Sequence, residues 1–278
     1  MTVIPEPNAS LLAELQDLAS RGDLASRCLC LRSYQSHRLK AVDIDTVFLV
    51  LPLQGIKRMR EHGQTLSVGP GEILLVPGPR RLDVENLPDP ASGEYAAIGI
   101  AIHEETLDLA RRLFPERTGE GAGKIASMPL DALSQPLTAW CTALKSGRIP
   151  FACHALLGLV LALYEMGHHG VLERRIPSLT ERVRGMIAET PACEWMSSDI
   201  ESAVAMSGAS IRRRLAAEGT SLRSIIVEAR LGCALELLYT TRLPVKAVAQ
   251  RVGYASASSF CKRFAERYGV EPSRVGGT

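Results

Sequence analysis

The sequence predicts an α+β protein, with a β-rich N-terminal part and an all-α C-terminal domain that contains two helix-turn-helix motifs. Three observations indicate this fold class. Short apolar runs with strand composition recur at roughly ten-residue spacing between positions 28 and 102, which is typical of a small barrel or jelly-roll. Two helical hairpins cover residues 198–219 and 244–269. The segment between them, residues 221–239, is apolar on two helical faces, so we expect it to be a helix sandwiched between the two motifs.

Composition places the protein among cytoplasmic, nucleic-acid-binding candidates. The length of 278 residues favours two domains, and the net charge of +2 is unevenly distributed: residues 178–278 hold 14 Lys and Arg against 10 Asp and Glu, and 12 of the 14 are Arg. Seven cysteines without zinc-ligand spacing indicate a reducing compartment. The N-terminus lacks the features of a signal peptide, and the apolar run 151–164 is too short to span a bilayer. We therefore expect a cytoplasmic, nucleoid-associated protein with no membrane contact.

The N-terminal part, residues 1–170, begins with a predicted helix at residues 8–21, where leucines share one side. The predicted β elements follow at residues 47–53, 56–68, 69–79, 82–87 and 95–102. A small-molecule pocket inside such a barrel is possible, and four polar residues lie on or beside its strands: Arg32, Tyr34, Gln54 and Arg58. The sequence does not say which of them point inward.

Three predicted helices follow at residues 104–114, 130–146 and 151–167. The last is apolar around its whole circumference, so either its own domain buries it or a second protomer covers one side. We favour a homodimer through Leu156, Leu157, Val160, Leu161 and Tyr164. A linker is expected at residues 171–177, before the C-terminal domain, residues 178–278.

An enzyme is not expected. A metal-dependent barrel of this kind needs two alternating histidines, a nearby glutamate and a later third histidine, and the six histidines do not show that spacing. His62 and His103 are interpreted as surface or strand-end residues. No nucleophile constellation is present either, so we predict no metal and no cofactor.

The second helix-turn-helix motif starts at Pro244, which favours a helix start, and Gly253 permits the turn. Phe260 and Phe264 are four residues apart and define the inward face of the second helix. The opposite face carries Ser258, Lys262 and Ala265, with Arg263 towards one flank. This arrangement is typical of a recognition helix, although a packed helical hairpin can imitate it.

The first motif has a more strongly cationic second helix. Ile211 and Leu215 face inward, Ala209 and Arg213 lie opposite, and Arg212 and Arg214 flank them. The three arginines could reach both base edges and phosphates, or form only a solvated face. Two capping boxes, Ser178 with Glu181 and Ser198 with Glu201, predict the starts of the preceding helices.

Residues 178–275 resemble the DNA-binding domain of the AraC/XylS transcription regulators. The resemblance rests on I-R-R-R-L and E-G-T-S-L in the first motif, R-L-x-x-A-x-x-L-L in the linking helix, and P-V-x-x-V-A, V-G-Y-x-S-x-S-x-F-x-x-x-F and Y-G-V-x-P in the second. It implies that one monomer contacts two adjacent major grooves of double-stranded DNA. The implied contact positions are Ala209, Arg212 and Arg213 in the first motif and Ala257, Ser258, Cys261 and Lys262 in the second. We also expect the flanking Arg214 and Arg263 to contact DNA.

The N-terminal half is similar to the cupin-like effector and dimerisation domain of the same family, through L-Q-G-x-K-R and G-P-G-E-I-L-L-V-P. The resemblance implies a regulator, mostly an activator, that contacts RNA polymerase and responds to a small molecule or a partner protein. A ligand-binding module with a degenerate DNA domain is the alternative.

The chain departs from the family pattern at two places. Glu201 stands where a small residue is usual beneath the turn, and the segment 273–276 replaces the usual aromatic and arginine, which bears on the last helix and not on DNA contact. Because Ala257, Ser258 and Cys261 offer little bidentate hydrogen bonding, we expect base discrimination to come mainly from Arg212 and Arg213.

Overall fold

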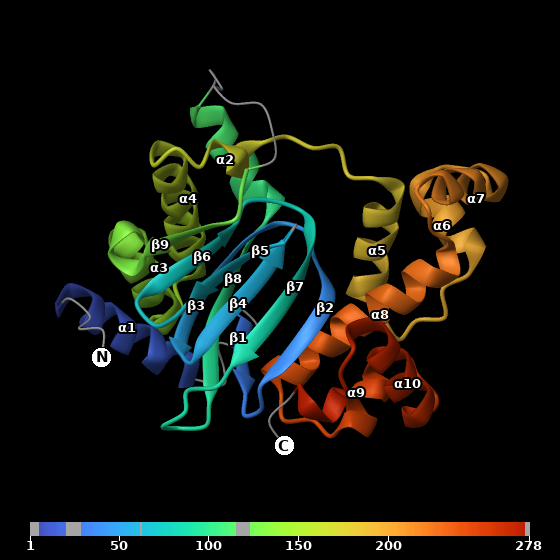
Figure 1. Ribbon diagram of the computed structural model, residues 1–278. Coiled ribbons are helices and arrows are strands. Elements are labelled where there is room, and N and C mark those ends of the chain that lie inside the picture. The colour runs from blue at the N-terminus through green and yellow to red at the C-terminus, as the bar shows by residue number, and fades with distance from the viewer. Residues whose placement is uncertain (1–5, 21–28, 62, 115–122, 276–278) are drawn as a thin grey trace. The chain divides into compact units, whose positions relative to one another are not determined.

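The computed structural model describes residues 6–20, 29–61, 63–114 and 123–275 (Figure 1). The chain divides into two compact units, residues 1–174 (unit 1) and residues 175–278 (unit 2). No helix within the described ranges combines the length and the apolar character needed to cross a membrane.

Unit 1 opens with helix α1 (Glu6–Ser20) and contains two antiparallel sheets. The five-stranded sheet has the order β1 (Leu29–Ser33), β8 (Tyr95–Ile102), β3 (Val47–Gln54), β6 (Glu72–Val76) and β9 (Ala126–Pro129). The four-stranded sheet has the order β2 (His37–Ile44), β7 (Arg80–Leu87), β4 (Ile56–Glu61) and β5 (Gln64–Val68). The α+β class is thus confirmed, whereas the strands form two separate sheets and a closed barrel is not confirmed.

One predicted element is different in the structure. The run 56–68 is a hairpin of β4 and β5, and Gly63 in its turn has a φ of 82°, a conformation that favours glycine. The sequence did not predict strand β2. This strand pairs with β7, with a register shift between Leu39 and Val42.

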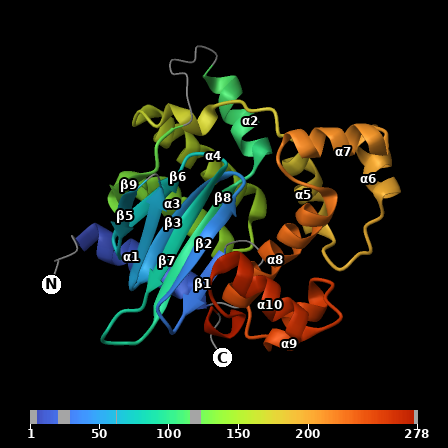
Figure 2. The ribbon, with the colours of Figure 1, turned by 45° about the vertical axis from the view of Figure 1, so that its right-hand side comes forward.

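The five-stranded sheet is the central layer of unit 1. Because successive side chains of a strand point to opposite faces, alternate residues such as Leu49 and Leu51 pack against the helices, whereas Val50 and Leu74 point to the other face. Figures 1 and 2 show α1, α3 (Ser134–Lys145) and α4 (Ile149–Glu165) on one side of this sheet and the four-stranded sheet on the other. Both faces of the central sheet are therefore buried.

Helix α4 is largely covered by its own unit. It packs against α3 and against α2 (Glu104–Leu113), and Val160 and Tyr164 are buried there. These two residues, expected at a dimer interface, are therefore not available to a partner in this arrangement. Leu156, Leu157 and Leu161 are half-buried, and Phe151, in the first turn of the helix, is exposed.

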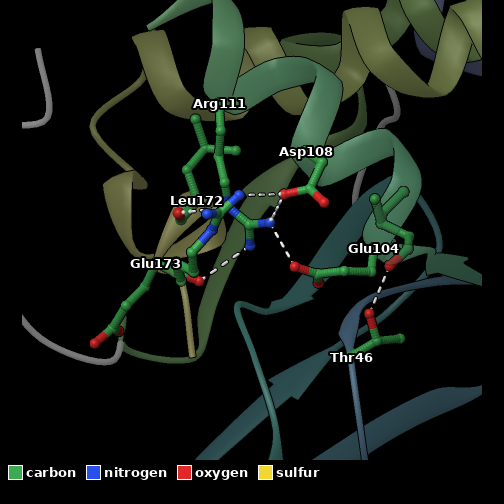
Figure 3. Close-up of polar contacts among 8 residues, drawn as sticks. Thr46, Glu104, Asp108, Arg111, Leu172 and Glu173 are labelled. Carbon is green, nitrogen blue, oxygen red and sulfur yellow. Dashed lines mark hydrogen bonds and ion pairs between the residues drawn. The ribbon is translucent and has the colours of Figure 1, made fainter. Parts of the chain in front are cut away.

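A buried arginine holds the end of unit 1 to α2 (Figure 3). The side chain of Arg111 is 4% exposed; it donates to the carbonyl oxygens of Leu172 (3.0 Å) and Glu173 (3.2 Å) and pairs with Glu104 and Asp108. Hydrogen bonds from Arg111 and then Arg174 hold the pKa of the Asp108 carboxyl below its ordinary value.

The start of the expected linker is consequently ordered. Val171 and Leu172 are buried in a short 3₁₀ helix, η3 (His169–Leu172), rather than lying in an open connection. The exposed stretch begins at residue 173.

Unit 2 is entirely helical in its described part. Its elements are α5 (Leu179–Glu189), α6 (Ser197–Val204), α7 (Gly208–Ala217), α8 (Leu222–Thr240), α9 (Val245–Arg251), α10 (Ala257–Tyr268) and the 3₁₀ turn η4 (Pro272–Arg274). The capping box of Ser178 and Glu181 at α5 is confirmed. Gly276, the last residue of the segment that departs from the family pattern, lies outside the described ranges.

Candidate nucleic-acid interface

Helix α7 presents three neighbouring guanidinium groups. The hydroxyl of Ser207 accepts from the backbone N–H of Ser210 and caps the helix, and Ile211 and Leu215 are buried beneath it. Arg212, Arg213 and Arg214 are all exposed, as is Ala209. Within the described part of the chain, Arg212 and Arg213 have no ion-pair or hydrogen-bond partner, whereas Arg214 lies 3.9 Å from Glu218. Two uncompensated arginines therefore remain available for an anionic ligand.

Glu218 fixes the end of α7 against the start of α5. Its carboxylate accepts from the backbone N–H groups of Leu179 (3.2 Å) and Thr180 (2.9 Å) and from the Thr180 hydroxyl (2.6 Å). An acidic group at a helix N-terminus is stabilised by the unpaired N–H groups there. The arginine-bearing helix is therefore held by a contact that is remote in sequence.

The predicted capping box of Ser198 and Glu201 is wrong, because α6 starts earlier. Met196 is the N-cap, and its backbone N–H donates to the Asp199 carboxylate at 2.7 Å. Glu201 instead accepts from the Ser197 hydroxyl (3.2 Å) and lies against Gly208, where an added Cβ would overlap the Glu201 carboxylate. The large residue beneath the turn is thus accommodated by a glycine at the start of α7.

Helix α10 has a buried face of bulky side chains and an outer face with few strong hydrogen-bonding groups. Phe260, Phe264 and Tyr268 are buried in a series of tilted ring contacts, and Gly269 ends the helix with a φ of 76°. Ser258 and Lys262 are exposed, and Ala257, Cys261 and Arg263 are half-buried. Burial raises the pKa of the Cys261 thiol, which therefore stays protonated and is a poor hydrogen-bonding group.

Helix α8 separates the two motifs. It has 19 residues, which corresponds to a length of about 28 Å; its first turn follows α7, and its last residue is followed by the loop that leads to α9 (Figures 1 and 2). Arg230 on α8 donates to the carbonyl oxygens of Pro191 (2.8 Å), Cys193 (2.9 Å) and Gly253 (3.1 Å). This side chain links the loop before the first motif to the turn of the second.

Comparisons with known proteins identify this arrangement. A family of helix-turn-helix domains matches residues 200–276. The urease operon transcriptional activator of Escherichia coli is 22% identical in an alignment 252 positions long, which covers 85% of each chain. A helix-turn-helix regulator of Mycobacterium tuberculosis of uncharacterized function is 42% identical over 101 residues, 36% of this chain and 29% of that one.

The chain belongs to the AraC/XylS family of transcription regulators. Its relatives are transcription regulators, and like them it is a DNA-binding regulator and not an enzyme. A crystal structure of ToxT from Vibrio cholerae has a TM-score of 0.61 at 14% identity and covers 89% of this chain and 94% of its own, which shows the same fold.

In this AraC/XylS regulator, the four polar residues expected to line an effector pocket do not come together. Arg32 on β1 pairs with Glu94 (3.0 Å), and Arg58 on β4 pairs with Glu85 (2.9 Å). Each alternates with buried neighbours along its strand, so both point away from the space between the sheets. Tyr34 is 48% exposed, and Gln54 is half-buried at the end of β3.

A different set of polar residues faces the interior of unit 1. His37, Asn86 and Lys57 are cross-strand neighbours on β2, β7 and β4, and all three are buried. The Lys57 ammonium nitrogen donates to Asn86 Oδ1 at 2.8 Å and lies 6.0 Å from the ring centre of Tyr95. Burial lowers the pKa of Lys57 from 10.5 to about 7.

Two residues of the five-stranded sheet adjoin this polar row. Ser33 Oγ lies 3.2 Å from His37 Nδ1, and Tyr95, opposite Ser33 in the register, is fully buried with no hydrogen-bond partner for its hydroxyl among the described residues. Sequence reasoning missed Lys57, although its alternation with Arg58 and Met59 was a signal that Lys57 and not Arg58 shares the inward face. His103 is exposed before α2, and His62 lies outside the described residues.

Proposed function

We propose that this regulator activates transcription by binding an asymmetric DNA site in which α7 discriminates bases and α10 is held mainly by phosphate. The observation that supports this division is a difference between the two helices. Helix α7 has two exposed arginines without a partner, whereas α10 has the small residues Ala257 and Ser258 and the protonated thiol of Cys261. Arginine donates two parallel hydrogen bonds to guanine in the major groove. In this proposal Ala209, Arg212 and Arg213 meet base edges, Arg214 meets phosphate, and Lys262 anchors α10.

The two motifs are proposed to enter neighbouring major grooves on one side of the duplex. Successive groove segments on one face are about 34 Å apart, and α8, a helix of about 28 Å, joins the two motifs along the chain. The assignment of residues 178–278 to DNA binding and 1–170 to effector binding and dimerisation is part of this proposal, as is contact with RNA polymerase.

Transcription with purified RNA polymerase tests the activator part. The template carries the site that the full-length protein selects from random DNA upstream of a weak promoter. The proposal expects more transcript with the protein than without it, and only from templates that carry the site. A decrease in transcript on the same template would contradict activation.

We further propose that unit 1 binds a small carboxylic acid between its two sheets, with Lys57 as the counter-charge. The buried amine and the unpartnered Tyr95 hydroxyl are the polar groups that such a ligand would satisfy. ToxT, which has this fold, has been crystallised with an unsaturated fatty acid and with a naphthalenyl butenoic acid, both carboxylic acids. The expected ligand residues Arg32 and Arg58 already have carboxylate partners and take no part in this proposal.

The pKa of Lys57 provides the test. An amine that is uncharged above about pH 7 takes up a proton when a carboxylate binds beside it, so affinity for an unsaturated fatty acid should fall as the pH rises from 7 to 9. Calorimetry at pH 8 in buffers of different ionisation enthalpy measures that proton uptake, and Lys57→Met should abolish it. Binding without proton uptake, or unchanged binding by Lys57→Met, would contradict the proposal.

Thermal unfolding between pH 7 and 9 checks the folding of the Lys57→Met variant. The unfolded state binds the Lys57 proton up to about pH 10.5 and the folded state only to about pH 7, so this residue makes stability rise between these values. Lys57→Met should therefore flatten the rise in Tm from pH 7 to 9.

A homodimer through α4 is proposed from its partly exposed leucines. Leu156, Leu157 and Leu161, with Phe151 at 54% exposure, form the part of the helix that unit 1 leaves uncovered. Phe151→Asp should convert a dimer into a monomer in sedimentation velocity. A dimer that survives this change would place the interface elsewhere.

A further inference from the structure

Unit 2 contains a pocket in which Arg263 is the one assigned DNA contact. It has a volume of about 530 Å³ and lies between the first half of α8 and the second helix-turn-helix motif. Its lining consists of Leu222, Arg223, Ile226, Val227, Arg230, Tyr254 and Arg263. Three of these seven residues are arginines and none is acidic, so the pocket is suited to an anion.

The positive charge of the pocket is not neutralised by the protein. Arg230 gives its hydrogen bonds to three backbone carbonyl oxygens, which leaves its charge uncompensated. Arg223 is exposed and Arg263 half-buried, and neither has an ion-pair or hydrogen-bond partner in the described ranges. An arginine charge persists at any physiological pH, so the field in the pocket is permanent.

Two further features favour an anionic ligand there. The hydroxyl of Tyr254 is buried, and no group in the described part of the protein accepts or donates a hydrogen bond to it. The pocket also includes the first turn of α8, whose N-terminal end carries a partial positive charge from its aligned peptide dipoles. A buried hydroxyl without a partner costs free energy that a ligand oxygen would recover.

Along the chain, the pocket residues begin just after α7 and end within α10. Its α8 residues follow α7 after a short turn at residues 218–221, and Arg263 belongs to α10, one residue after the groove-facing Lys262. A duplex that contacts both α7 and α10 must pass its backbone across the interval between them. An anion in this pocket would therefore belong to the DNA segment that joins the two grooves.

We propose that this pocket binds backbone phosphates of the DNA segment between the two major-groove contacts, through Arg223 and Arg263. Arg230 adds fixed charge at the floor of the pocket, and the Tyr254 hydroxyl donates to a phosphate oxygen. The contact is independent of base sequence and positions the two motifs on one duplex. It rests on the proposed function, because it requires that α7 and α10 engage the same DNA molecule.

Equilibrium binding of the full-length protein to DNA over a range of KCl concentrations tests the proposal. The test variant is Arg223→Gln/Arg263→Gln, which keeps two polar side chains of similar length without the charge. Each lost phosphate contact makes the slope of log K against log salt shallower by about 0.9, so the double variant should lose about 2 in slope and bind on the order of tenfold more weakly near 0.15 M salt. The matched control is Arg242→Gln, an exposed arginine of unit 2 outside the pocket, whose effect should be smaller.

A chemical change in the DNA locates the contact. Neutral methylphosphonate linkages between the two groove segments should weaken binding by the unchanged protein and have no further effect on the double variant. Arg223→Lys/Arg263→Lys, which restores the charges, should restore the salt slope. Base preferences in site selection should be the same for all of these proteins.

Three results would overturn the proposal. The first is an unchanged salt slope in the double variant, and the second is an altered base preference. The third is normal DNA binding with loss of transcription in the RNA polymerase assay, which would assign the pocket to an acidic protein segment. The slope is also measured on random duplex DNA, so that a failure to select any site, which contradicts the proposed function, is distinguished from a failure of the pocket.

Discussion

The two helix-turn-helix motifs share a scaffold and differ in the chemistry of their outer faces. In both, two bulky side chains are buried beneath the second helix: Ile211 and Leu215 in α7, and Phe260 and Phe264 in α10. In both, a serine hydroxyl caps that helix. Three consecutive arginines then follow in α7, whereas α10 has Lys262 and Arg263 among the small residues Ala257, Ser258 and Cys261. The comparison teaches that a motif fixes where a helix lies, while its few outward residues decide whether it discriminates bases or only positions the protein.

The largest effect on this comparison is expected from Arg213→Ala. Loss of a bidentate contact to guanine should cost about 1 to 3 kcal/mol of binding and remove preference at one base position. Binding to the selected site and to its single-base variants measures this. Equal weakening on every sequence would make Arg213 a phosphate contact and reverse its role.

A change at Gly208 should disturb the first motif alone. Gly208→Ala places a Cβ on the Glu201 carboxylate, the flexible end of a half-buried side chain, so this carboxylate must move aside and unit 2 should be destabilised by less than about 1 kcal/mol. Glu201→Ala in the same chain should relieve the overlap and recover most of the loss in thermal unfolding.

Gly232→Ala on α8 is the matched control for this change. A Cβ there meets nothing, so the change should stabilise the helix slightly. If Gly208→Ala stabilises unit 2 as much as Gly232→Ala does, the displacement of the Glu201 carboxylate has no measurable cost.

Lys262→Ala should weaken DNA binding without changing base preference. The expected signature is a salt slope shallower by about 1, because one phosphate contact is lost. Titrations at several KCl concentrations on specific and random duplexes provide the measurement. A changed base preference with the slope intact would make α10 a discriminating helix.

The smallest effect is expected from Cys261→Ser. The half-buried thiol is protonated because burial raises its pKa, and it offers only a weak hydrogen bond, so affinity should change by no more than about twofold. Selection of DNA sites by the variant should return the same sequence. A new base preference would show that this position contacts a base.

The helical unit could be predicted from the sequence far better than the sheets. The spacing of Val248, Phe260 and Phe264, the capping box of Ser178 and Glu181, and the stop at Gly269 are local signals with a helical period. The start of α6 was misplaced because Asp199 competes with Glu201 as the acidic residue of the cap. Two plausible carboxylates within one turn cannot be ranked by spacing alone.

The polar residues of unit 1 could not be placed because strand direction depends on distant partners. A shift of one residue moves every side chain of a strand to the other face, and the pairing of β4 with β7 decides that Lys57 and not Arg58 faces inward. Arg32 pairs with Glu94, a residue 62 positions away. Local sequence patterns do not reveal such an ion pair. The contact roles of Ala257, Ser258, Cys261, Lys262 and Arg263 stay predictions.

Selection and sequencing of DNA bound by the full-length protein, alone and with Arg213→Ala, tests the central claim most directly. The account predicts one asymmetric site with two segments about one helical turn apart. One segment should have strong base preference that Arg213→Ala weakens, and the other should have weak preference that it leaves unchanged. Two results would contradict the division between α7 and α10. One is equal base preference in both segments, and the other is a strong base preference that Arg213→Ala leaves unchanged.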